Sequence, residues 1–182
     1  LKIEGLATTL YQVVMELIGN AIKANIKRIY FERKGLSIDD PEDYARGIEG
    51  FSAAYPVIDR ENYARAMQDL DLHVSLEIDL DARRLLIFVE NNTVLVPEEE
   101  NRIRAKLAGA MDVKDVMEFF KAYGDDLEGR GLGLAMIVFL IRDLGFPAEH
   151  FRVFKTDTRT IARIEFPLDT NYSPTRSQAI GS

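Results

Sequence analysis

Cysteine is absent from this chain of 182 residues, and histidine occurs only twice. Without cysteine there can be no disulfide bond, no thiolate nucleophile and no cysteine-ligated zinc site, and a reducing cytoplasm is a compartment that fits. No apolar run reaches the roughly eighteen residues of a membrane span, so no membrane contact is expected. Acidic residues outnumber basic ones by 30 to 23, and the net charge of −7 argues against nucleic-acid binding. A local phosphate site built from backbone amides remains compatible with that charge.

The length of the chain suits one α/β domain that carries an insertion. We assign residues 1–168 to this domain, and residues 169–182, which are rich in polar residues, to a flexible tail. The chain begins with Leu1 and shows no signal peptide, so we expect it to be a piece of a longer protein.

The periodicity of apolar residues gives the expected secondary structure. It predicts helices over residues 5–25, 98–108, 113–123 and 134–144, and strands over residues 27–33, 73–80, 83–89, 151–155 and 160–166. Consecutive strands are expected to pair as hairpins, with helices covering one face of the sheet. The expected fold is therefore an α+β two-layer sandwich and not a doubly wound sheet.

The polar stretch 35–71 interrupts this pattern and is expected to be a helical insertion. One helix should start at residues 39–42, with Pro41 in its first turn, and a second should cover residues 61–70. The simpler interpretation is a surface insert packed on the edge of the sheet. The alternative is a subdomain that docks a partner or regulates the domain.

Three polar residues share one face of the first predicted helix. Glu16, Asn20 and Lys23 are separated by four and three positions, which places them in one stripe. A carboxylate can deprotonate a nucleophile, an amide oxygen can bind Mg²⁺, and a lysine can neutralise phosphate. The same spacing also arises on an ordinary solvated helix face, so by itself it leaves both interpretations open.

A glycine-rich segment, residues 129–133 (Gly-Arg-Gly-Leu-Gly), runs directly into the apolar helix over 134–144. Glycines allow close backbone approach, and a helix N-terminus offers N–H groups to phosphate. The segment lacks the preceding strand of a Rossmann loop and the Gly-Lys-Ser/Thr of a Walker A loop. A flexible linker with a glycine cap would give the same pattern.

Taken together, these segments resemble the GHKL ATPases, which include gyrase-type topoisomerases, a heat-shock chaperone family, histidine kinases and MutL-type proteins. Residues 16–23 (Glu-Leu-Ile-Gly-Asn-Ala-Ile-Lys) resemble the N box, and residues 89–99 resemble the segment around the first glycine box. Residues 129–135 resemble the second glycine box in its histidine-kinase form, and residues 160–168 resemble the closing strand. The resemblance covers nearly the whole chain and implies a mixed, mostly antiparallel sheet with helices on one face.

The resemblance implies ATP and Mg²⁺ as ligands, with the phosphate end of the site on the first helix. Asn20 would bind Mg²⁺, Lys23 would approach the phosphates, and Glu16 stands where gyrase-type members carry a catalytic carboxylate. The second glycine box would wrap the triphosphate through Gly129, Arg130, Gly131, Leu132 and Gly133. Residues 97–130 would form the ATP lid.

At the adenine end, the resemblance places Asn91 and Thr160 near the base. Asn91 stands where the family has an aspartate, and an amide oxygen can accept the same hydrogen bond without its charge. Thr93 and Leu95 replace the two glycines of the first glycine box, so their side chains would narrow the pocket for the base.

A histidine autokinase needs an acceptor histidine on a dimerisation helix, and neither histidine of this chain fits. His73 lies in a predicted strand and His150 lies beside a proline-containing turn. We therefore expect the acceptor on another domain or protein, with a response regulator as a further partner. A homodimer formed through residues upstream of Leu1 would suit this arrangement.

The leading interpretation is the ATP-binding catalytic domain of a cytoplasmic sensor histidine kinase, which would transfer the γ-phosphoryl group of Mg·ATP in two-component signalling. One alternative is a degenerate member of the fold that acts as a protein-interaction or regulatory module. Another is a serine/threonine kinase of the anti-sigma-factor type, with which Glu16 is compatible.

Overall fold

The structure is a computed structural model that describes residues 3–113, 116–123, 132–169, 171–172 and 174. Its α-helices are α1 (Ile3–Arg33), α2 (Pro41–Ala54), α3 (Arg60–Asp69), α4 (Pro97–Asp112), α5 (Val116–Tyr123) and α6 (Leu132–Asp143). Its strands are β1 (Val74–Leu80), β2 (Arg84–Asn91), β3 (Phe151–Lys155) and β4 (Thr160–Pro167). Short 3₁₀ helices, η1 (Tyr55–Val57) and η3 (Ala148–His150), follow α2 and precede β3. In the described part of the chain, no helix is long and apolar enough to span a bilayer.

The strands form one sheet in the order β1-β2-β4-β3, and every neighbouring pair is antiparallel. The α+β class expected from the sequence is therefore confirmed, but the expected mixed sheet is wrong. Both β1–β2 and β3–β4 are hairpins, and the hairpins meet through β2 and β4, which leaves no parallel pair among the described strands. In the first hairpin, the Asp81 carboxylate accepts the backbone N–H groups of Arg83 and Arg84 and fixes the turn.

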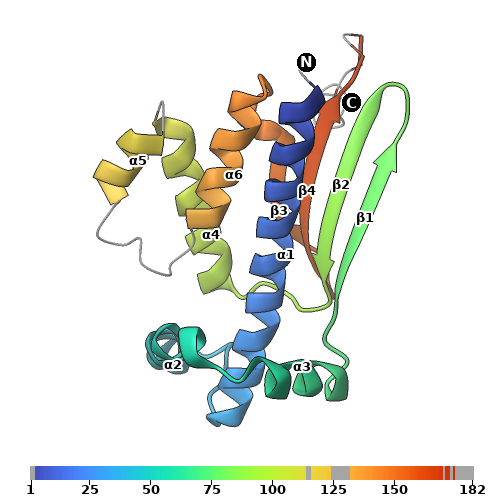
Figure 1. The fold of residues 1–182 in the computed structure, drawn as a ribbon. Coiled ribbons are helices and arrows are strands. Elements are labelled where there is room, and N and C mark those ends of the chain that lie inside the picture. Colours follow the sequence, from blue (N-terminus) through green and yellow to red (C-terminus); the bar gives the residue numbers. More distant parts are fainter. Residues whose placement is uncertain (1–2, 114–115, 124–131, 170, 173, 175–182) are drawn as a thin grey trace.

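Helices α1, α4 and α6 lie on one side of the sheet, as Figure 1 shows. The main core fills the space between α1, α6 and the sheet, and its fully buried members include Val13, Ile137, Val138, Ile141 and Ile164. Helix α6 ends just before Gly145. This glycine has a φ of +82°, a conformation that glycine adopts without strain, so the chain can turn there toward β3.

Helix α1 runs without a break to Arg33, so the strand predicted over residues 27–33 is wrong. The alternation of Ile29 and Phe31 with polar neighbours indicated a half-buried strand. In the structure these two side chains are buried in two different clusters on α1: Ile29 packs with Phe51, and Phe31 packs with Tyr44. A helix can bury both because the insertion provides apolar partners on more than one side.

The insertion consists of α2, η1 and α3, as the sequence predicted, and its first helix begins at the expected place. Asp40 caps α2 by accepting the N–H groups of Glu42 and Asp43, and Pro41 occupies the first turn. The expectation that the insertion packs on the edge of the sheet is wrong. It packs across the C-terminal half of α1, below the sheet in Figure 1, because Ile26 and Ile29 of that half give it an apolar surface.

Candidate functional site

Glu16 and Asn20 form a hydrogen-bonded pair on α1. The Asn20 side-chain amide donates to the Glu16 carboxylate over 3.0 Å, between residues one helical turn apart. Because the amide nitrogen is used in this bond, the amide oxygen is the atom that Asn20 can offer to a ligand. Asparagine oxygen is a suitable ligand for Mg²⁺, so the orientation fits the role expected from the sequence.

The Glu16 carboxylate lies directly against the first turn of α6. A Cβ atom added to Gly133 would lie 1.5 Å from a carboxylate oxygen of Glu16, so no other residue fits beside this carboxylate as it stands. The first turn of a helix has N–H groups without helical partners and a partial positive charge, which favour a nearby anion. The structure thus brings Glu16 of α1 and Gly133 of α6 together.

Lys23 lies one turn beyond Asn20, and both residues line a cavity of about 170 Å³. The Lys23 ammonium group lies over the ring of Tyr55, 4.7 Å from its centroid. Burial lowers the pKa of Lys23, the positive charge of Arg102 lowers it further, and Glu16 partly offsets both effects. Burial in the cavity wall therefore disfavours the charged form of Lys23.

The cavity lies between α1, α2 and α4. Its described lining consists of Asn20, Lys23, Ala24, Lys27, Tyr44, Ile48, Phe51, Ser52, Leu95, Glu99, Arg102, Ile103, Lys106 and Leu134. A second, wider cavity of about 740 Å³ between α2 and α4 shares Tyr44, Ile48, Ser52, Arg102 and Lys106 with it. Of the lining side chains, Lys23, Lys27, Arg102 and Lys106 are basic, and Glu99 is acidic. This excess of positive charge suits a polyanionic ligand.

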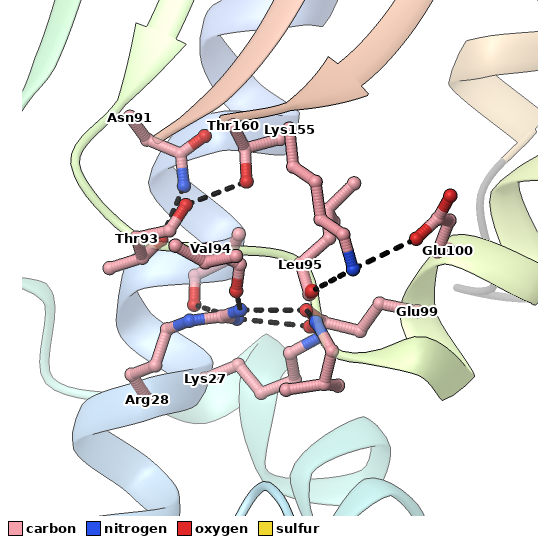
Figure 2. Close-up of polar contacts among 12 residues, drawn as sticks. Lys27, Arg28, Asn91, Thr93, Val94, Leu95, Glu99, Glu100, Lys155 and Thr160 are labelled. Carbon is pink, nitrogen blue, oxygen red and sulfur yellow. Dashed lines mark hydrogen bonds and ion pairs between the residues drawn. The ribbon is translucent and has the colours of Figure 1, made fainter. Parts of the chain in front are cut away.

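Glu99 joins α4 to α1 through an ion cluster (Figure 2). Its two carboxylate oxygens accept from Arg28 over 2.9 and 2.6 Å, and Lys27 forms a salt bridge with the same carboxylate. Burial alone would raise the pKa of Glu99, but the Arg28 hydrogen bonds and the charges of Lys27 and Arg28 lower it to about 2. Burial lowers the pKa of Lys27 to about 8, because one carboxylate shared with Arg28 compensates it only in part.

The segment between β2 and α4 is held by its own backbone groups. The Val94 carbonyl accepts from Arg28 over 2.8 Å, and the Leu95 carbonyl accepts from Lys155 over 3.4 Å. The Val96 N–H donates to Glu99 over 3.3 Å, which caps α4. These contacts tie residues 94–96 to α1, β3 and α4.

Asn91 and Thr160 lie side by side because they are register partners of β2 and β4. The Asn91 amide donates to Thr93 over 2.5 Å and to Asn25 over 3.4 Å, and the Thr160 hydroxyl donates to the Thr93 carbonyl over 2.6 Å. Asn91 is only 5% exposed and Thr160 only 8%. Neither residue lines the cavity, so their polar groups form an internal network (Figure 2).

The sequence-predicted residues Gly129, Arg130 and Gly131 lie outside the described residues, and Leu132 is described only as the first residue of α6. Conversely, Arg102 and Lys106 were not predicted as site residues from the sequence. These two residues are one turn apart on α4 and face the cavity together with Glu99. Their spacing was visible in the sequence, but only the packing of α4 against α1 and α2 shows which face borders the cavity.

A metal would find few protein ligands here. In the ranges that the structure describes, no group of three or more histidine, cysteine, aspartate or glutamate side chains could hold a metal ion. Asn20 supplies one oriented oxygen beside the Glu16 carboxylate. These residues therefore suit a Mg²⁺ ion that arrives bound to phosphate oxygens, which is the usual way in which proteins bind this ion with nucleotides.

No protein-family model matches the sequence, and no solved structure matches it. A protein of Treponema pallidum (strain Nichols), described only as an uncharacterized protein, is 34% identical to it over 154 residues, or 85% of this chain. The chain spans about 30% of the length of that relative.

Proposed function

We propose that this domain binds Mg·ATP in the basic cavity and is the catalytic part of a kinase that transfers the γ-phosphoryl group to a histidine elsewhere. The observation that carries the proposal is the Glu16–Asn20 pair. It stands against the first turn of α6, and Asn20 also lines a cavity with four basic side chains. A bound polyphosphate would meet an amide oxygen, a helix N-terminus and several cations in one place.

Within this proposal, each described residue has a limited task. Asn20 holds the Mg²⁺ ion, which supplies neutralising charge to the phosphate oxygens when it is bound. Lys23 and Arg102 bind phosphate oxygens and keep the transferred group in position. Glu16 orients Asn20 and is the carboxylate available to accept a proton from an attacking group.

The described histidines favour an acceptor outside this domain. His73 is exposed at the start of the first hairpin, with its ring nitrogen 3.2 Å from the Asp71 carbonyl. Burial lowers the pKa of His150, and its Nδ1 atom is buried without a hydrogen-bond partner. Neither histidine lines the cavity, which supports an acceptor supplied by another domain or protein.

A second candidate is a regulatory module that binds nucleotide without turning it over. The observation that favours it is the network of Asn91, Thr93 and Thr160, whose polar groups are bonded to one another instead of facing the cavity. A serine/threonine kinase is a third candidate, because Glu16 could activate a hydroxyl as well as an imidazole.

The test is calorimetric titration of ATP, with and without Mg²⁺, into the domain and its Asn20→Ala variant. We expect Mg²⁺-dependent binding by the domain and at least about a tenfold loss of affinity in the variant, since a metal contact is removed. Gln12→Ala, an exposed residue on the same helix, is the matched control and should bind as the unchanged domain does. Absence of binding at millimolar Mg·ATP would refute the proposal.

A second measurement separates the kinase from the regulatory module. ADP release from Mg·ATP, followed over hours, should be detectable and should fall in Glu16→Gln if the domain turns nucleotide over. Binding with no ADP production, even after addition of histidine-bearing peptides, would favour the regulatory module.

A further inference from the structure

We infer that the cavity between α1, α2 and α4 recognises the polyphosphate chain of its ligand and not the base, so that it takes nucleoside triphosphates of any base. This inference rests on the proposed nucleotide-binding function and specifies its ligand class. Three features support it. The residues expected to contact the base are bonded to one another, the wall that the insertion contributes is apolar, and the basic side chains lie on two helices that face one another.

The first feature is that the residues expected to read adenine are already bonded to one another. Asn91 donates to both Thr93 and Asn25, and Asn25 is fully buried. Both bonds use the Asn91 amide nitrogen and hold this side chain in its buried orientation, so turning it toward a base would break them and leave polar groups without partners. Within residues 93–96, Leu95 lines the cavity, and its side chain can neither donate nor accept a hydrogen bond.

The second feature is the wall that the insertion contributes. Ile48 and Phe51 present apolar surface, and the Ser52 hydroxyl donates to the Ile48 carbonyl over 2.8 Å. The Tyr44 hydroxyl accepts from Arg102 over 3.2 Å. Discrimination between bases depends on hydrogen bonds to their edges, whereas apolar contact accepts every base. This wall can therefore cover a base without identifying it.

The third feature is that the charged groups come from two helices that face one another across the cavity. Lys23 and Lys27 project from α1, while Arg102 and Lys106 project from α4. Glu99 is the acidic side chain among the described lining residues, and it is already bonded to Arg28 and Lys27. Contacts of cations with phosphate oxygens are strong and independent of the base. The affinity should therefore depend on the number of phosphates.

The experiment is calorimetric titration of the domain with Mg·ATP, Mg·GTP, Mg·CTP, AMP and inorganic tripolyphosphate. We expect the three triphosphates to bind within about threefold of one another, and AMP to bind at least about 100-fold more weakly than ATP, because it lacks the phosphates that the cations contact. Tripolyphosphate should compete with ATP. ATP binding more than about tenfold tighter than both GTP and CTP, or AMP binding close to ATP, would overturn the inference.

Variants on α4 give an independent check. Arg102→Ala and Lys106→Ala should each lower the affinity for all three triphosphates by about tenfold, and to the same degree for each. Arg104→Ala is the matched control, because Arg104 is an exposed residue of the same helix that pairs with Glu100, and its affinities should not change. An unequal loss across the bases would contradict the inference.

The outcomes also separate this inference from the function on which it rests. Tight binding that is selective for ATP would overturn the inference and leave the proposed function standing. Equal binding of all triphosphates without ADP release would support the inference and remove only the phosphoryl-transfer part of the function. Absence of binding by every triphosphate and by tripolyphosphate would overturn both.

Discussion

Two glycines in helix interiors show how residue environment decides the effect of one methyl group. Gly19 of α1 has nothing within 4 Å of an added Cβ, whereas a Cβ on Gly47 of α2 would lie 2.3 Å from the ring of Phe31. Phe31 is 1% exposed and is packed against Tyr44, so its ring cannot move aside. The packing of α2 on Phe31 therefore requires glycine at position 47, whereas position 19 has room for a side chain.

The first prediction compares alanine at these two positions. Gly19→Ala should raise the free energy of unfolding by about 1 kcal/mol, because alanine is the better helix former. Gly47→Ala should lower it by roughly 1–3 kcal/mol, because overpacking outweighs the same propensity gain. Denaturant unfolding of both variants measures the two values. If both substitutions changed the free energy of unfolding in the same direction, the packing of α2 on Phe31 would be contradicted.

The second prediction concerns Glu99, whose pKa of about 2 lies below its ordinary value of 4.5. Because the folded-state pKa is lowered, the ionised carboxylate stabilises the fold above pH 4.5, and this contribution disappears as the pH falls toward 2. The shift corresponds to about 3 kcal/mol at most. Glu99→Gln should therefore be clearly less stable than the unchanged domain at about pH 6, and the difference should shrink by about pH 3.

The matched control for Glu99 is its neighbour Glu100, which pairs with Arg104 and Lys155 at the surface. Surface pairs contribute about 0–1 kcal/mol, so Glu100→Gln should have a small effect at about pH 6. Denaturant unfolding at both pH values gives the comparison. A Glu99→Gln penalty that did not change with pH would show that ion pairing with Arg28 is not its source.

At the scale of elements, the length of α1 organises the molecule. Its N-terminal half packs on the sheet and α6, and its C-terminal half carries the insertion. The polar stripe of Glu16, Asn20 and Lys23 lies where these two halves meet, so both the first turn of α6 and the insertion border the site. Helix α4 completes the cavity and is anchored to α1 by Glu99.

The third prediction tests whether the insertion is part of the domain core. Phe51 of α2 is 2% exposed and packs with Ile26 and Ile29, so Phe51→Ala should cost about 3–5 kcal/mol. Phe154 on the edge strand β3 is 38% exposed, and Phe154→Ala should cost about 1 kcal/mol or less. Thermal and denaturant unfolding measure both. If Phe51→Ala lowered the free energy of unfolding as little as Phe154→Ala does, the packing of the insertion on α1 would not contribute to the stability of the domain.

At the scale of the whole molecule, the cavity exists only because three helices from distant parts of the chain converge. Residues 20–27, 44–52 and 99–106 each contribute one wall. A ligand that bridges these walls should stabilise the assembled domain, because it binds the folded state and not the unfolded chain.

The fourth prediction is the size of that stabilisation. At a free Mg·ATP concentration of about 100 times Kd, the free energy of unfolding should rise by about 2.7 kcal/mol. For a domain of this length, that corresponds to a rise in Tm of roughly 5–10 °C. Differential scanning calorimetry measures it. Asn20→Ala at the same nucleotide concentration should show a smaller rise, and a shift equal to that of the unchanged domain would contradict the role given to Asn20.

Those features of the protein that depend on local patterns could be predicted from its sequence. The hairpins, the Asp40 cap of α2 and the Glu16–Asn20–Lys23 face depend on interactions within a few residues, which a sequence displays directly. The strand expected over residues 27–33 failed because short apolar alternation cannot reveal that Ile29 and Phe31 pack against a later insertion.

What the polar residues face could not be predicted from local patterns, because it depends on how distant elements pack. It placed Asn20 and Lys23 on a cavity with Arg102 and Lys106, and it turned Asn91 and Thr160 toward an internal network instead. Whether a side chain lines a cavity or satisfies a buried neighbour depends on the packing of elements far apart in sequence. That packing is set by the burial of apolar surface across the whole chain, which no local motif contains.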